Sequence, residues 1–204
     1  MQDLYTERPL QLPPLYERRK TMKTDEIIKR LLENLGLDPE SEYLKDTPSR
    51  VRKMLEFITS GYRVNIEELF EKSVFTKKYD QMIIAKDIDF FSMCEHHLLP
   101  FYGKIHIGYM PKEKVIGLSK LARIAEAFSR RLQVQERMTQ EIAESIEKYL
   151  KPTGVGVVVE ARHLCMMMRG VEKVNSIITT SVMLGTFKED EKTRREFLNL
   201  IKTQ

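Results

Sequence analysis

The sequence predicts an α+β fold, a four-stranded antiparallel sheet with helices on one face. Segments with the 3.6-residue apolar period of helices occupy the first third, the middle and the end of the chain. Between them lie two pairs of segments rich in β-branched and aromatic residues, within 82–109 and 155–187. Since each pair has the pattern of a hairpin-like unit, we expect the two pairs to join in one antiparallel sheet.

The N-terminal third is predicted to be helical after a flexible arm. Residues 1–22 contain three prolines and show no clear period, which is typical of a mobile segment. Thr24 is the expected N-cap of a helix that stops at Gly36. Asp46-Thr47-Pro48 has the pattern of a second helix start, and Gly61 is its expected end. With a short helix at 66–70, residues 23–75 form a predicted helical extension of the main domain, 76–204.

The main domain alternates between strands and helices. The predicted strands are 82–91, with apolar stretches at 82–85 and 88–91, then 102–109, 155–161 and 174–187. The predicted helices are 119–128, 135–150 and 194–201. Ser119 is the expected cap of the first helix, and Pro152-Thr153-Gly154 ends the second. The strand 155–161 is almost continuously apolar, so we expect it to be covered on both faces.

Composition describes a soluble globular protein and excludes several classes. The chain has 204 residues, of which 42% are hydrophobic and 31% charged, with a net charge of +4. That charge excludes neither nucleic acid nor an anionic small molecule as a partner. Two cysteines are too few for a disulfide scaffold. Because no apolar run is long enough for a membrane span and no signal-peptide core is present, we expect a cytoplasmic protein without a membrane partner.

Potential metal ligands gather in two short segments about 70 residues apart. Cys94, His96 and His97 lie in the first segment, and His163 and Cys165 in the second. Cys94 and His97 are close enough in the chain to reach one ion, while alternation on a predicted strand gives His163 and Cys165 one face. Thiolate and imidazole together favour zinc. The number of candidates leaves open a catalytic site with three protein ligands, a closed structural site, or buried cysteines with incidental histidines.

Basic residues and one carboxylate surround these segments. Ser119, Lys120 and Arg123 open a predicted helix, whose N-terminus suits phosphate. Further basic groups that favour a polyphosphate ligand are Arg50, Lys53, Arg130, Arg131, Arg137, Arg169 and Lys173. Glu136 begins another helix, where a carboxylate interacts with the helix dipole or accepts two parallel hydrogen bonds from a guanine edge.

Five collinear motifs resemble the zinc-dependent GTP cyclohydrolase I family. They are Asp46-Thr47-Pro48-Ser49-Arg50-Val51, Cys94-Glu95-His96-His97, Gly117-Leu118-Ser119-Lys120-Leu121-Ala122-Arg123, Gln133-Val134-Gln135-Glu136-Arg137 and His163-Leu164-Cys165-Met166-Met167-Met168-Arg169-Gly170. The resemblance covers about residues 24–203. It departs from the family at Leu132, where some members have proline.

The resemblance implies a fold, an assembly and a reaction. The implied fold is the tunnelling fold, whose four-stranded sheets close into a ring, with two five-membered rings stacked as a homodecamer. The implied reaction converts GTP and water to 7,8-dihydroneopterin triphosphate and formate, the first step of tetrahydrofolate or tetrahydrobiopterin synthesis. The implied cofactor is one Zn²⁺ per subunit.

The resemblance also assigns site residues. The implied zinc ligands are Cys94, His97 and Cys165, and the implied proton-transfer pair is His96 and His163. Glu136 is the implied guanine anchor, helped by Gln135. The implied triphosphate contacts are Lys53, Ser119, Lys120, Arg123 and Arg169, with Arg50 beside them.

Two other functions agree with parts of the sequence. A zinc-stabilised protein that binds nucleic acid through its basic face would need aromatic stacking groups among the basic residues. Near Lys120 and Arg123 only Phe128 is aromatic, and its spacing predicts a core position. The sequence therefore disfavours nucleic acid. The other alternative is a tunnelling-fold relative that acts on a different purine or pterin.

Overall fold

The computed structural model describes residues 22–77 and 79–202. The chain divides into two compact units, of which the first ends at Phe57 and the second begins at Ile58. The expected N-terminal arm lies, apart from Met22, outside the described residues. Among the described helices, none is both long and apolar enough to cross a membrane.

The N-terminal unit is built on two amphipathic helices, α1 (Thr24–Asn34) and α2 (Thr47–Ile58). Lys23 occupies the N-cap position of α1 in place of the expected Thr24, and no side chain caps that end. The left-handed φ of +78° at Gly36 ends the helix as predicted. Arg52 on α2 binds Asp25 on α1, with 2.9 Å between Nε and Oδ1.

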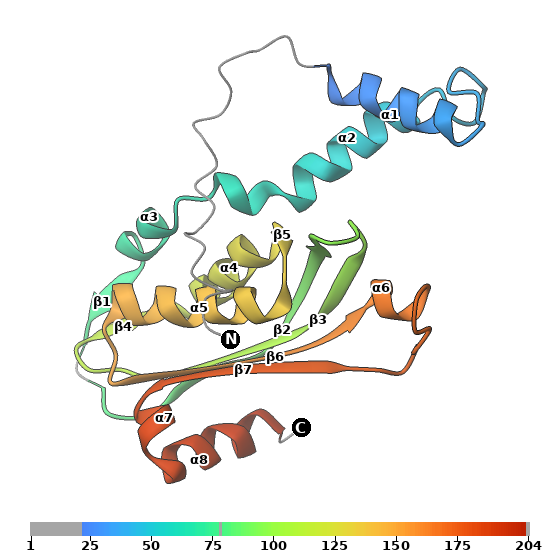
Figure 1. Ribbon diagram of the computed structural model, residues 1–204. Coiled ribbons are helices and arrows are strands. Elements are labelled where there is room, and N and C mark those ends of the chain that lie inside the picture. Colours follow the sequence, from blue (N-terminus) through green and yellow to red (C-terminus); the bar gives the residue numbers. More distant parts are fainter. Residues whose placement is uncertain (1–21, 78, 203–204) are drawn as a thin grey trace, which may run out of the picture. The chain divides into compact units, whose positions relative to one another are not determined.

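The second unit contains an antiparallel sheet in the order β2-β3-β6-β7 (Figure 1). These strands are β2 (Ile83–Cys94), β3 (Pro100–Met110), β6 (Gly154–His163) and β7 (Ile178–Gly185). The two predicted hairpin-like pairs are thus confirmed. A fifth strand that the sequence did not predict, β5 (Leu132–Gln133), runs parallel to the end of β2. A separate two-stranded sheet joins β1 (Val74–Thr76) to β4 (Lys114–Ile116).

A β-bulge interrupts β2 between the two apolar stretches, 82–85 and 88–91, that the sequence predicted within one strand. The register with β3 shifts between Ala85 and Ile88, and Asp87 adopts a left-handed φ of +59°. The N–H of Asp87 donates to His106 Nδ1 at 3.2 Å, which satisfies the backbone group that the bulge leaves unpaired. The apolar alternation therefore continues through a single long strand.

Helices pack against both faces of the sheet, which corrects the expectation of one face. The main core forms between the sheet and the helices α3 (Ile66–Glu71), α4 (Leu118–Ser129) and α5 (Gln135–Leu150). The C-terminal helices α7 (Thr186–Glu189) and α8 (Glu191–Lys202) lie against the opposite face (Figure 1). Their Phe187 and Phe197 are fully buried there, and the two rings meet edge to face.

Two glycines form the flat part of the sheet that receives these rings. Gly108 on β3 and Gly156 on β6 are register partners. A Cβ at Gly108 would come within 2.7 Å of Phe197, and one at Gly156 within 2.6 Å of Phe187. Because real side chains do not approach so closely, glycine at both positions allows α7 and α8 to pack on this face.

Candidate metal centre and active site

Three side chains of metal-ligand type converge at one end of the sheet. Cys94 ends β2, His97 lies in the turn that follows, and Cys165 lies in the short helix α6 (Leu164–Met167). Their ligand atoms all lie within 4.8 Å of one another, and Cys94 Sγ is 3.7 Å from His97 Nδ1. The sequence had put Cys165 on a strand beside His163, but only His163 belongs to the strand, and it is not a member of this cluster.

The cluster fits a thiophilic divalent cation. Bond lengths typical of zinc put tetrahedral ligand atoms about 3.5–3.8 Å apart. The Cys94–His97 separation of 3.7 Å lies in this range, and the other separations do not exceed 4.8 Å. Burial, and then the neighbouring Cys94 thiol, raises the pKa of Cys165, while Arg169 acts in the opposite direction. A bound cation would stabilise both thiolates. Three protein ligands leave a fourth position for water or substrate, which is the pattern of a catalytic rather than a structural site.

A tight turn presents the first two ligands. The N–H of Leu98 donates to the carbonyl of Cys94, and the N–H of Cys94 donates to that of Leu99, both at 2.9 Å. Leu98 itself adopts a left-handed φ of +53°. These bonds close the turn over residues 94–99, so Cys94 and His97 point to one side of it.

An ion pair fixes this turn to α5. Arg137 donates from its two terminal nitrogens to the two carboxylate oxygens of Glu95, at 3.3 and 2.5 Å. Its Nε donates to Gln133 Oε1 at 3.0 Å, and the N–H of Glu95 donates to the carbonyl of Gln133 at 3.1 Å. Arg137 therefore supports the metal-binding turn. It does not belong to the free basic surface that the sequence predicted. The sequence also gave no sign that Glu95 anchors the turn, because its partner Arg137 is 42 residues away.

The two predicted proton-transfer histidines have different surroundings. His96 is exposed beside the cluster, with Nδ1 3.9 Å from Cys94 Sγ. His163 is half-buried, and its ring stacks on Phe101 with a centroid distance of 4.6 Å. Burial lowers the pKa of His163, and the nearby carboxylate of Glu136 partly opposes that effect. His163 thus lies between an apolar wall and an exposed carboxylate.

Gln135 and Glu136 begin α5 but point in different directions. Glu136 is exposed, as a group that contacts a ligand must be. Gln135 is only 1% exposed, and its Oε1 lies 2.7 Å from His163 Nε2. The side chain of Gln135 is therefore directed into the protein, away from the exposed surface that Glu136 occupies.

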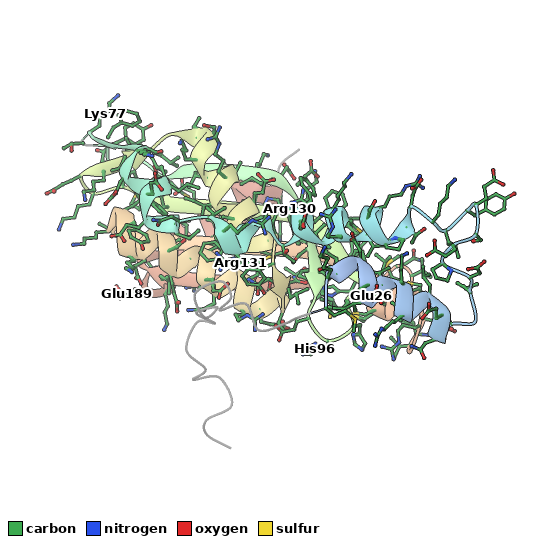
Figure 2. All side chains as sticks on the ribbon, turned by 90° about the horizontal axis from the view of Figure 1, so that it is seen from above. Glu26, Lys77, His96, Arg130, Arg131 and Glu189 are labelled. Carbon is green, nitrogen blue, oxygen red and sulfur yellow. The ribbon has the colours of Figure 1, made fainter. Side chains whose placement is uncertain are left out.

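The predicted phosphate contacts Ser119 and Lys120 lie far from the metal cluster. Gly117, not Ser119, is the N-cap of α4. Just before it, the N–H of Ile116 donates to the hydroxyl of Tyr109 near the end of β3. The ring that stacks on His163, Phe101, is at the start of β3, eight residues or about 26 Å away. Figure 2 shows the corresponding ends of this unit, with Lys77 after β1 at one end and His96 at the other.

The other predicted basic contacts are distributed over both units. Arg169 is exposed and close enough to influence the pKa of Cys165, so it lies near the metal cluster. Arg123 lines a groove of about 220 Å³ beside β2. Lys53 and Arg50 lie on α2 in the N-terminal unit, where Arg50 binds Asp46 at 3.1 Å.

One further arginine of the predicted basic field proves to be structural. Arg131 lies over the ring of Phe128, with 4.7 Å from Cζ to the centroid, and donates from Nε to the carbonyl of Ala127. Burial lowers its pKa. Arg131 therefore packs against the edge of the hydrophobic core. Phe128 is buried, as the sequence predicted.

The family model and the curated relatives agree with one another. The family model described as GTP cyclohydrolase I matches residues 24–202. GTP cyclohydrolase 1 of Chlorobium phaeovibrioides is 57% identical over 194 residues, covering 95% of this chain and 85% of the relative. The human GTP cyclohydrolase 1 is 56% identical over 173 residues, covering 85% of this chain and 69% of the relative. Among solved structures, an archaeosine synthase in its apo form aligns with 53% of this chain and 97% of its own, at 14% identity and a TM-score of 0.43.

Proposed function

This chain belongs to the GTP cyclohydrolase I family, and we propose that the cluster of Cys94, His97 and Cys165 is the metal centre of its active site. The enzyme converts GTP and water to 7,8-dihydroneopterin triphosphate and formate, in pterin and folate biosynthesis. The observation that carries the proposed site is the convergence of three soft ligands beside His163 and Glu136. We propose one zinc ion per subunit, because two thiolates and an imidazole favour zinc over harder cations.

Each neighbouring side chain has a proposed part in opening the imidazole ring of GTP. Bound zinc supplies the Lewis acidity that makes water nucleophilic near neutral pH. The carboxylate of Glu136 accepts hydrogen bonds from N1–H and N2–H₂ of guanine and so orients C8 toward the cluster. Because C8 is a poor electrophile, His163 in its imidazolium form donates a proton to N7 as water attacks and is left neutral. His96, exposed at the rim, transfers the proton needed for ring opening and loss of formate.

A second copy of this chain completes the proposed site. Ser119 and Lys120 are separated from His163 by about the length of β3, more than a bound GTP spans from C8 to its γ-phosphate. Arg169 near the cluster contacts the triphosphate from the same chain, while Ser119, Lys120 and Arg123 come from a neighbour. Lys53 and Arg50 are also proposed triphosphate contacts.

The assembly we propose is the ring of the tunnelling fold, a decamer of two stacked pentamers. The edge strand β7 pairs, among the described strands, only with β6, so its other side is available to a neighbouring sheet. Apolar side chains are exposed around the cluster end of the unit, namely Phe91, Leu98, Met168, Val171 and Ile177. Such an edge and such side chains favour burial between subunits. We propose a cytoplasmic location, where free thiols persist.

The test is incubation of the purified, zinc-loaded protein with GTP, scored for formate and for pterin fluorescence after oxidation. Both products should form, and chelation of zinc should abolish both. The His163→Ala variant should bind zinc normally and lose most of the activity, since His163 is not a ligand. Formate without pterin would limit the activity to ring opening. If neither product forms at one zinc per chain, the proposal is wrong.

A further inference from the structure

The buried amide of Gln135 can adopt only one orientation. Its Nε2 lies 3.1 Å from the carbonyl oxygen of Val159, 3.0 Å from that of Ile178 and 3.1 Å from Thr180 Oγ1. Backbone carbonyls accept hydrogen bonds and cannot donate them, so the group that faces them must be the NH₂. The amide oxygen of Gln135 therefore faces the other way, toward His163 Nε2 at 2.7 Å.

Two threonine hydroxyls reinforce this orientation. Thr139 donates to the backbone carbonyl of Gln135 at 2.7 Å, so its oxygen is an acceptor for the hydroxyl of Thr180, also at 2.7 Å. Thr180 has then used its proton and accepts from Gln135 Nε2. Thr139 is fully buried and Gln135 is 1% exposed, which leaves little access for water to replace these bonds. The donor and the acceptor of each hydrogen bond in this network are therefore fixed.

This direction determines which nitrogen of His163 carries a proton. An amide oxygen has no proton to give, so the 2.7 Å contact is a hydrogen bond only if His163 Nε2 is protonated. Neutral His163 is then the Nε2–H tautomer, with its lone pair on Nδ1. Stacking on Phe101, at an interplanar angle of 6°, holds the ring in place. In the described part of the chain, Nδ1 has no hydrogen-bond partner.

We propose that Gln135 is a positioning residue that holds His163 in the Nε2–H tautomer, so that Nδ1 is the atom that exchanges a proton with the substrate. This inference rests on the proton-transfer role proposed above for His163. It gives the Gln135 side chain a task separate from guanine binding, which stays with the exposed Glu136. It also explains why position 135 carries an amide, since a carboxylate there would face two carbonyl oxygens at close range.

Nitrogen spectroscopy of the zinc-loaded protein tests the tautomer directly. Solid-state NMR of protein labelled with ¹⁵N-histidine, recorded above the pH range of imidazole titration, distinguishes Nε2–H from Nδ1–H rings. The His163→Ala variant identifies the signals of His163 among those of the four histidines. The parent should show the Nε2–H form. A parent spectrum with the Nδ1–H form would overturn the proposal, whatever the activity.

Kinetics of Gln135→Met then separates positioning from folding. Methionine has a similar length but no amide, so His163 loses both the acceptor that fixes its tautomer and the hydrogen bond that orients its ring. We therefore expect kcat for formate release to fall at least tenfold, with KM for GTP within threefold. The control is Ser145→Ala, which removes another buried hydrogen-bonded side chain of α5 and should keep the parent kcat. A Gln135→Met enzyme with the parent kcat contradicts the inference. A parent that releases no formate would instead overturn the proposed function, while its spectrum still decides the tautomer.

Discussion

His106 is a buried histidine outside the proposed active site. It is 4% exposed, and burial lowers its pKa. The carboxylates of Asp87 and Glu160 oppose that effect, and Lys86 adds to it. In the unfolded chain the imidazole has its ordinary pKa of about 6.5 and binds a proton more readily than in the fold. The free energy of unfolding therefore increases with pH up to about 6.5, and this stability is lost as the pH falls below that value.

Replacing His106 by asparagine should flatten this pH dependence. The Oδ1 of asparagine can accept the Asp87 N–H that His106 Nδ1 now accepts, so the β-bulge is retained. Between pH 7.5 and 5.5 the parent should lose more unfolding free energy than His106→Asn, by up to about 1.4 kcal/mol per pH unit. Urea unfolding at the two pH values measures the difference. Equal losses in both proteins would show that another group causes the acid sensitivity.

At the scale of residues, the sequence predicts the metal-ligand cluster better than it predicts the side chains that hold the cluster in place. Cys94 and His97 are three residues apart, and chain spacing alone brings them to one ion. The pairing of Glu95 with Arg137 depends on β5 lying beside β2, which places α5 next to the turn. No local pattern signals such a contact. The inward direction of Gln135 is equally hidden, because a polar residue at a helix start is usually exposed.

The Glu95–Arg137 pair connects the metal-binding turn to a helix, so its loss should weaken metal binding. Arg137→Met keeps the length and apolar stem of the side chain but removes both hydrogen bonds to Glu95. We expect zinc affinity to fall about 10- to 100-fold, as for other groups that orient metal ligands. Competition with a chromogenic chelator measures it. The matched control is Arg195→Met, which breaks an exposed ion pair with Glu191 on α8 and should leave zinc affinity unchanged.

Among the elements, long periodic segments were predictable and short ones were not. The helix expected at 135–150 has those bounds in the structure, because its apolar period and the Pro152-Thr153-Gly154 break are both strong signals. The strand β5 has two residues, and α6 has four, so neither can show a period. That α8 covers the second face of the sheet depends on a pair of glycines on different strands, a relation that only the register reveals.

The packing of α8 on these glycines gives a prediction at the same scale. Gly156→Ala would bring a Cβ within 2.6 Å of Phe187 and 2.9 Å of Phe197. Because both rings are fully buried and cannot move aside, the change should cost about 1–3 kcal/mol of unfolding free energy. In a Phe197→Leu background the same change should cost less, with a coupling of about 0.5–3 kcal/mol in urea unfolding. Additive costs would mean that Phe197 does not resist the methyl group and that Phe187 or the strand itself does.

For the whole molecule, sequence motifs indicate which residues act together but not which copy supplies them. Lys120 and His163 belong to motifs of one family, yet Ile116 ties the start of α4 to Tyr109, at the end of β3 remote from His163. Only the fold reveals this separation. Because β3 and β6 are antiparallel, the motif that follows the end of β3 and the motif at the end of β6 lie at opposite ends of the same sheet. The site that we propose contains both groups and therefore combines two chains, in an interface that joins different surfaces of each.

Subunit complementation tests this composite site. Lys120→Ala and His163→Ala should each be nearly inactive alone, because every site lacks one group. Co-expressed in equal amounts, they should form mixed assemblies in which about a quarter of the sites, one half times one half, combine an intact His163 with an intact Lys120 from the neighbour. Formate release should recover to about that fraction. Lys120→Ala mixed with Arg123→Ala is the control, and it should recover nothing because both changes affect the same end. Absence of recovery in the first mixture, with mixed assemblies verified by mass spectrometry, would mean that each chain builds its site alone.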